Sequence, residues 1–286
     1  MLKKINKLLI EPINYRIHTE KILSHKLIFS INSGRSGSNY LADLLGTAEE
    51  VKSYHEASPP MIGDFLEMIN RHEYNHSFKQ RQIKSQAIKN SLLQLSKEQI
   101  YSETNHMFIK TFFDVIIHDF QKIEVIILRR HLASVLKSFI ELGYFSSKNQ
   151  VWPQWLSSPN AVTAAISCIA DDQDLDQYDL CIGYLIDIEA RAIRFQKNYP
   201  GIKTHEVRLE NLNHFENVKE LFKQLRITPT QETESMYKTK INQRSSRKKQ
   251  HSNEPVEIDY CHKRIEQYID IATQKGIAIP ASLALS

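Results

Sequence analysis

One stretch of the chain, residues 26–45, limits the possible folds more than any other part of the sequence. Residues 26–31 form an apolar run that predicts a buried strand. Farther along, apolar residues recur at helical spacing at Leu41, Leu44, Leu45 and Ala48. A short loop rich in glycine and small polar residues separates these two segments. The stretch therefore predicts a strand, a tight loop and a helix in direct succession.

The loop carries residues that suit an anionic ligand. Gly34 and Gly37 allow the backbone to turn tightly and to approach a ligand closely. Ser36 and Ser38 add hydroxyl donors, and Arg35 adds a charged planar fork. Because a helix follows, backbone N–H groups and the positive end of the helix dipole point at one spot. The pattern predicts phosphate binding, and a turn without any ligand is the simpler alternative.

The loop differs from two common nucleotide-binding loops. A nucleoside triphosphatase needs a Gly-Lys pair followed by Ser or Thr, which hold the terminal phosphates and magnesium. From Gly34 to Asn39 this chain reads Gly-Arg-Ser-Gly-Ser-Asn, which has no lysine and not that spacing. The dinucleotide pattern Gly-x-Gly-x-x-Gly is also absent. Hydrolysis of ATP or GTP is therefore disfavoured, and a P-loop kinase is kept as an alternative enzyme class.

Strand and helix patterns alternate along the rest of the chain. This alternation predicts an α/β fold, a parallel β-sheet flanked by helices. We expect one domain over residues 1–286, with its core at about 26–250, a short N-terminal extension and a C-terminal helix. The further strands are expected at 51–55, 107–110, 123–128 and 204–209, and the further helices at 62–99, 132–140, 178–199, 216–225 and 254–275.

Composition excludes several other classes of protein. Lys and Arg number 37 and Asp and Glu number 33, a mild excess of +4 that is too small for a nucleic-acid-binding surface. Cys168, Cys181 and Cys261 are scattered, which suits a reducing compartment and gives no metal spacing. No segment predicts a signal peptide or a membrane span. We expect a cytoplasmic protein, and the sequence leaves a homodimer open.

A second candidate anion site lies where the strand at 123–128 gives way to a helix. Arg130 stands at the C-terminal edge of this strand, and Ser138 follows eight positions later, two turns along the helix. Two donors at this separation suit a second phosphate. The alternative is that Arg130 only covers the edge of the sheet and Ser138 is an ordinary helix residue.

Together, the loop and this junction resemble the sulfotransferases that use 3′-phosphoadenosine-5′-phosphosulfate (PAPS), particularly the bacterial and carbohydrate-type members. The resemblance implies a P-loop NTPase-like sulfotransferase fold, PAPS as the sulfuryl donor, and no metal. It implies that the loop binds the 5′-phosphosulfate and that Arg130 and Ser138 bind the 3′-phosphate. Residues 206–212 are similar to a further strand of that family, and the basic run 244–249 resembles a late loop that closes on the 3′-phosphate. The cofactor-binding residues implied are Gly34, Arg35, Ser36, Gly37, Ser38, Asn39, Arg130, Ser138, Arg247 and Lys248.

The resemblance offers two patterns for the catalytic base. Phenol and steroid sulfotransferases carry Lys-Thr-His where this chain reads Lys110-Thr111-Phe112, so their histidine is missing here. Several carbohydrate and bacterial members instead use a glutamate just after the second strand, which implies Glu56. A positioned carboxylate suits general-base catalysis. Arg35 or Lys110 is expected to supply positive charge beside the transferring group.

Other assignments of the base and of the acceptor stay open. His55 and Glu103 are the reserve candidates for the base, and His106 and His118 are expected to be structural. Trp152 and Trp155 could stack on a sugar ring or simply pack in the protein. The expected acceptor is a hydroxyl of a carbohydrate, lipid or small metabolite. The alternative without catalysis is a protein that binds PAPS or its desulfonated product.

Overall fold

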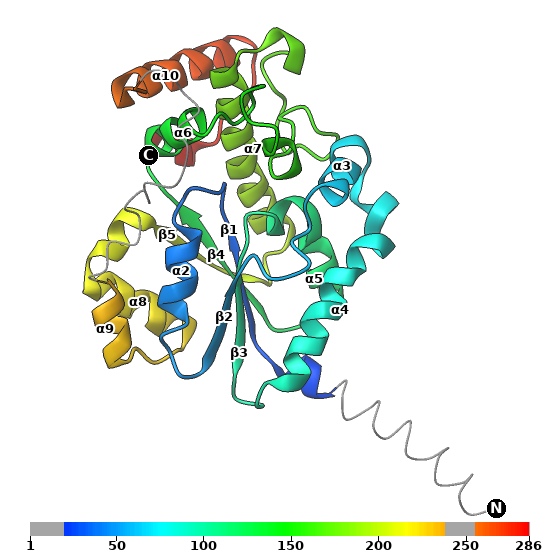
Figure 1. Cartoon of the computed structure of the whole chain (residues 1–286), viewed down its shortest axis with the longest axis vertical. Helices are drawn as coiled ribbons and strands as arrows, with labels where there is room; N and C mark the ends of the chain where they lie inside the picture. Colours follow the sequence, from blue (N-terminus) through cyan, green and yellow to red (C-terminus); the bar gives the residue numbers. More distant parts are fainter. Residues whose placement is uncertain (1–19, 238–254, 286) are drawn as a thin grey trace, which may run out of the picture.

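The computed structural model describes residues 20–237 and 255–285, and its centre is a parallel β-sheet. Five strands pair in the order β2-β3-β1-β4-β5, and every pair is parallel. Helices cover both faces of this sheet (Figure 1). The predicted α/β class with a parallel sheet flanked by helices is confirmed. The strands are β1 (Leu27–Ile31), β2 (Val51–His55), β3 (Ile100–Thr104), β4 (Ile123–Arg129) and β5 (Lys203–Arg208).

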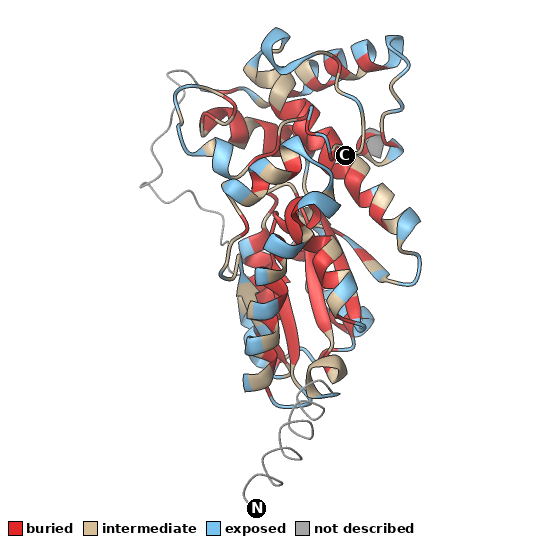
Figure 2. Cartoon of the chain, turned by 90° about the vertical axis from the view of Figure 1, so that its right-hand side faces the viewer, coloured by how far each residue is buried: buried red, intermediate tan, exposed pale blue. Residues whose placement is uncertain are grey.

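Strand β1 lies in the middle of the sheet, and every one of its residues is buried. Leu27 pairs with Tyr101 of β3 on one side and with Ile123 of β4 on the other. Side chains alternate between the faces, so Phe29 belongs to one apolar cluster and Ile28 to the other. Figure 2 shows the strands buried between their covering helices. A strand buried on both faces explains the continuous apolar run in the sequence.

The helices divide between the two faces. Helices α2 (Ser38–Leu45), α8 (Phe215–Leu225) and α9 (Gln231–Tyr237) pack on the face that includes Ile28. The opposite face is covered by helices that include α4 and α5, while α6 and α10 pack together beyond the carboxyl end of the sheet (Figure 1). These remaining helices are α3 (Asp64–Arg71), α4 (Phe78–Gln94), α5 (Phe113–Asp119), α6 (Leu132–Glu141), α7 (Gln177–Asn198) and α10 (Ile258–Gln274).

The third strand lies seven residues earlier in the chain than the sequence predicts. Residues 107–110 were expected to form it, but they belong to a helical segment with a π-type turn at Phe108–Phe112 that leads into α5. The true strand, β3, contains Ser102, Glu103 and Thr104, all buried. Apolar content alone predicted the wrong segment, because Glu103 and Thr104 of β3 find partners inside the protein.

The other expected elements agree closely with the structure. The helix expected over 62–99 is divided into α3 and α4 by an extended residue at His72 and a short 3₁₀ turn at Tyr74–Ser77. The expected strands at 51–55, 123–128 and 204–209 are confirmed, as are the expected helices at 132–140, 178–199 and 216–225. Across the ranges described here, no helix is long and apolar enough to cross a membrane.

A buried ion pair joins strand β3 to helix α4, which covers the sheet. Lys84 Nζ lies 2.7 Å from Glu103 Oε1, and both side chains are fully buried. The same ammonium donates to the carbonyl oxygens of Ala57 and Pro59, at 2.6 and 3.2 Å. Tyr101 and Asn105 donate to the two carboxylate oxygens of Glu103. The pair therefore satisfies both charges and fixes the segment that follows β2.

Lys84→Ala should destabilise the fold strongly, because it leaves the carboxylate of Glu103 buried without its counter-charge. We expect the free energy of unfolding to fall by about 3–5 kcal/mol, measured by urea denaturation. Lys219→Ala is the matched control, since Lys219 pairs with Glu216 on the surface and its loss should cost about 0–1 kcal/mol. Equal losses in the two variants would contradict this account of Lys84.

Candidate functional site

A cavity of about 300 Å³ opens at the carboxyl edge of the sheet. Its wall combines the loop after β1 with residues that follow β2, β3, β4 and α6. Ligands of open parallel sheets bind outside the carboxyl ends of the strands, so the location suits a functional site. The residues that line it are Ser33, Gly34, Arg35, Gly37, Ser38, Asn39, His55, Glu56, His106, Arg130, Tyr144, Trp155 and Leu156.

The loop between β1 and α2 adopts the tight turn expected from its glycines. Gly34, Arg35 and Gly37 all have positive φ, at 80°, 56° and 92°. Asn32 Oδ1 accepts a hydrogen bond of 3.0 Å from the backbone N–H of Gly34 and braces the first part of the turn. Since three of four successive residues take the left-handed conformation, the loop is a curved cradle of backbone rather than an extended link.

Helix α2 begins at Ser38 and directs its N-terminus at this cavity. Gly37 occupies the cap position, and no side chain from the described part of the chain caps the helix. The first turn also contains no acidic residue. The N–H groups of a first helical turn have no partner within the helix, and the dipole makes that end positive. An anion in the cavity would satisfy both requirements.

Two arginines lie together at the loop. Arg130 Nη1 donates a hydrogen bond of 2.9 Å to the backbone carbonyl of Arg35, and Arg35 Nε donates one of 3.1 Å to Ser138 Oγ. Burial and the nearby guanidinium of Arg35 lower the pKa of Arg130, while Glu210 opposes them. The structure thus brings Arg35, Arg130 and Ser138 together from two separate strand-to-helix junctions. Two guanidinium groups this close favour an anion between them.

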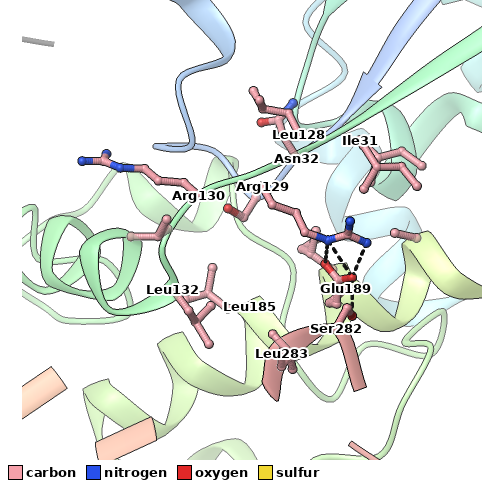
Figure 3. A pocket seen from close by; sticks show the side chains of 15 residues that line it. Ile31, Asn32, Leu128, Arg129, Arg130, Leu132, Leu185, Glu189, Ser282 and Leu283 are labelled. Atoms are coloured by element: carbon pink, nitrogen blue, oxygen red, sulfur yellow. Dashed lines mark hydrogen bonds and ion pairs between the residues drawn. The ribbon is translucent and has the colours of Figure 1, made fainter. Parts of the chain in front are cut away.

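Adjacent Arg129 points away from this cluster. Its guanidinium forms an ion pair with Glu189 at 2.6 Å and another with Glu206 at 2.9 Å. Figure 3 shows Arg129 turned toward Glu189 and Arg130 turned to the other side of the chain, beside a small cavity of about 50 Å³. The carboxylates raise the pKa of Arg129 against the opposing effect of burial. The guanidinium of Arg129 is therefore occupied by ion pairs within the fold, whereas that of Arg130 contacts the loop.

Glu56 lies in the cavity wall between two histidines. Its Oε1 atom is 3.7 Å from His55 Nε2 and 3.5 Å from His106 Nε2. The side chains of Glu56 and His55 are 26% and 29% exposed, so both can meet a ligand, whereas that of His106 is 7% exposed. Glu56 also has a positive φ of 50°, an uncommon backbone conformation for this residue type. Glu56, the carboxylate predicted as the base, therefore lines the same cavity as the loop at 33–39.

His106 is the residue that the sequence reading missed. It was expected to be structural, but its ring lines the cavity and faces Glu56. His106 stands two residues beyond the end of β3, the same kind of position that Arg130 occupies after β4. The signal was present in the sequence, but it was hidden because the strand was placed at 107–110.

Two predicted catalytic candidates lie behind the cavity wall. Glu103 is fully buried in the pair with Lys84 and does not line the cavity. Lys110 is fully buried as well; it donates hydrogen bonds to Trp155 O and Tyr184 Oη, and its Nζ lies 3.0 Å from His106 Nδ1. Burial lowers the pKa of Lys110 well below its ordinary value. Lys110 therefore contacts the ring of His106 from behind and does not line the cavity.

The remaining predicted residues fall into three groups. Ser36 is 1% exposed, and its hydroxyl turns inward toward Asn32. Trp155 lines the cavity, whereas Trp152 packs against Phe145. Arg247 and Lys248 lie outside the described residues.

Comparisons with known proteins give a distant likeness. The sequence matches no protein family, and no curated protein matches it significantly. Sulfotransferase STF1 from Mycobacterium tuberculosis H37Rv is 13% identical with a TM-score of 0.47, over 89% of this chain and 80% of that one. The sulfotransferase domain from the curacin biosynthetic pathway is 14% identical with a TM-score of 0.47, over 90% of this chain and 99% of that one. At this level of similarity, function has to be inferred from the residues of the cavity.

Gly37→Ala should damage the cradle. A Cβ atom at Gly37 would lie 2.5 Å from Leu209 Cδ1, and the φ of 92° disfavours any side chain. We expect a loss of about 1–3 kcal/mol in the free energy of unfolding, measured by chemical denaturation. Gly201→Ala is the control, because a Cβ there meets nothing within 4 Å, and its effect should stay within about 0.5 kcal/mol. A neutral Gly37→Ala would contradict the described turn.

Proposed function

We propose that the chain is a sulfotransferase that moves the sulfuryl group of PAPS to a hydroxyl group. The observation that carries the proposal is one cavity in which an anion cradle and a carboxylate face each other. The cradle combines the loop, Arg35 and Arg130, and the carboxylate is Glu56. A base beside an anionic donor is the arrangement that transfer to a hydroxyl requires. The acceptor is proposed to be a carbohydrate, a lipid or a small metabolite.

The residues present suit a donor with phosphates at two positions. The glycine-rich turn and the uncapped N-terminus of α2 offer backbone N–H groups to the 5′-phosphosulfate. Arg130 and Ser138 stand at the next strand-to-helix junction and are assigned to the 3′-phosphate. Ser138 already accepts a hydrogen bond from Arg35, so the two anion sites are continuous through these side chains. Bound PAPS would supply the sulfuryl group and a phosphate leaving group.

The chain's own groups have separate parts in the reaction. Glu56 receives the proton of the acceptor hydroxyl while the oxygen attacks sulfur. Arg35 stabilises the negative charge that develops beside the loop, since its terminal nitrogens make no hydrogen bond within the described residues. The buried Lys110 lies too far behind the wall for that part, and we assign it to holding His106. Trp155 and Leu156 form the apolar part of the wall on which an acceptor can rest.

A P-loop kinase remains the competing enzyme class, and its requirements are less well met. Phosphoryl transfer from ATP uses a lysine at the phosphates and a hydroxyl on magnesium. Among the described residues, those that line the cavity include two arginines but no lysine. A protein that binds the nucleotide without turnover has the same cradle, and it would show no dependence on Glu56.

The phosphate assignment is tested by calorimetry with adenosine 3′,5′-bisphosphate, adenosine 5′-monophosphate, and ATP with magnesium. We expect the bisphosphate to bind most tightly. Arg130→Ala should weaken bisphosphate binding by about 10- to 100-fold, since charge-assisted hydrogen bonds contribute about 1.5–3 kcal/mol, and should affect the monophosphate little. Arg129→Ala is the matched control, because its guanidinium is committed to Glu189 and Glu206. Preferential binding of ATP would overturn the proposal in favour of the kinase.

The role of Glu56 is tested by Glu56→Gln, which keeps the side chain's shape and removes its basicity. We expect kcat for sulfuryl transfer to fall by about 100- to 10,000-fold, with the affinity for the bisphosphate nearly unchanged. Glu73→Gln, on an exposed residue, should have no effect on either quantity. Full activity in Glu56→Gln would assign the base to another group in the cavity wall.

A further inference from the structure

The two histidines beside Glu56 carry their ring protons on opposite sides. His55 Nδ1 lies 3.1 Å from both the carbonyl oxygen and the hydroxyl oxygen of Thr104. A carbonyl oxygen can only accept, and the hydroxyl of Thr104 already donates to Ser38 O at 2.8 Å. The proton of neutral His55 therefore sits on Nδ1. Its Nε2 atom, which faces Glu56, carries a lone pair.

For His106 the arrangement is reversed. Lys110 Nζ lies 3.0 Å from His106 Nδ1, and its other two partners, Trp155 O and Tyr184 Oη, both accept from it. Tyr184 Oη can accept because its own hydrogen goes to Ser33 O at 3.0 Å. When Lys110 carries its ammonium charge, its third hydrogen goes to His106 Nδ1, and the ring hydrogen of neutral His106 is then on Nε2. That N–H points at the carboxylate of Glu56.

We propose that His55 takes the proton from Glu56 during turnover, while His106 holds the carboxylate in place as a fixed donor. This inference rests on the proposed sulfotransferase activity. The acceptor oxygen forms its bond to sulfur, the bond from sulfur to the phosphate oxygen breaks, and its electron pair leaves with the nucleotide. The hydroxyl proton passes to Glu56 and then to His55 Nε2, which becomes an imidazolium. His55 is 29% exposed and releases this proton to water.

The distances from Glu56 to the two histidine rings are compatible with contacts that shorten when a ligand binds. At 3.7 and 3.5 Å the two Nε2 atoms lie beyond the hydrogen-bond length of about 3 Å. Catalytic hydrogen bonds are often longer in a ligand-free site and shorten when substrate binds. Burial and the charge of Lys110 lower the pKa of His106 well below its ordinary value, which keeps this ring from gaining a second proton. Within the cavity wall, the ionisable groups around His55 are Arg35, Glu56, His106, Arg130 and Tyr144.

The ring protons are tested first, in the full chain, by nitrogen-15 NMR of the imidazoles. His55→Gln and His106→Gln assign the two signals. We expect a protonated Nδ1 and a bare Nε2 in His55, and a protonated Nε2 in His106. This measurement needs neither cofactor nor activity. A bare Nδ1 in His55, or a bare Nε2 in His106, would overturn the inference.

The proton transfer is tested by the pH dependence of kcat. Only a neutral imidazole can accept a proton, so protonation of His55 before turnover should lower the rate on the acid side of the pH profile, its acid limb. His55→Gln should lower kcat by about 100-fold at high pH and remove this acid limb, with bisphosphate affinity unchanged. His106→Gln should lower kcat and keep the limb. His118→Asn, on an exposed residue, is the control and should match the native chain.

The possible failures are distinguishable. An acid limb that persists in His55→Gln would overturn the relay while leaving sulfuryl transfer intact. A native chain that fails to bind the bisphosphate would instead overturn the proposed function on which the relay rests.

Discussion

The ammonium group of Lys110 is the contact on which both halves of the site depend. Its three donors meet Trp155 O, Tyr184 Oη and His106 Nδ1, and Tyr184 in turn donates to Ser33 O in the loop. One buried amino group thus joins the loop at Ser33, the neighbour of the proposed base and the cavity wall at Trp155. A buried polar group must have its hydrogen bonds satisfied, so these segments cannot move independently without cost.

Lys84 does the same for the segment on the other side of Glu56. Its ammonium group holds the carbonyls of Ala57 and Pro59 and forms the buried pair with Glu103. Both lysines thus supply donors to irregular backbone, whose carbonyls have no strand or helix partner. Glu56 and His106 are consequently fixed from behind by groups that no ligand touches. Preorganisation of this kind lets a base act without first being positioned.

The sequence predicted the cradle well because its information is local. Two glycines, an arginine and a following helix lie within about twenty residues, and the Arg130 junction repeats the same strand-to-helix pattern. The third strand was mispredicted because Glu103 makes β3 look like a polar loop, and only its distant partner Lys84 reveals that it is buried. That error also hid His106. The contacts of Lys110 with Trp155 and Tyr184 were equally inaccessible, since they join residues 45 and 74 positions apart.

The left-handed backbone at Arg35 and Glu56 has a consequence for how such a chain can change over time. Side chains other than glycine lose about 1–2 kcal/mol in this conformation, so the fold would gain stability from glycine at either position. Selection for heat resistance alone would therefore remove the two groups to which we assign anion binding and proton transfer. Met61, Phe145 and Arg226 share this backbone conformation, so strain by itself does not mark a site. What sets Arg35 and Glu56 apart is the cavity that both line.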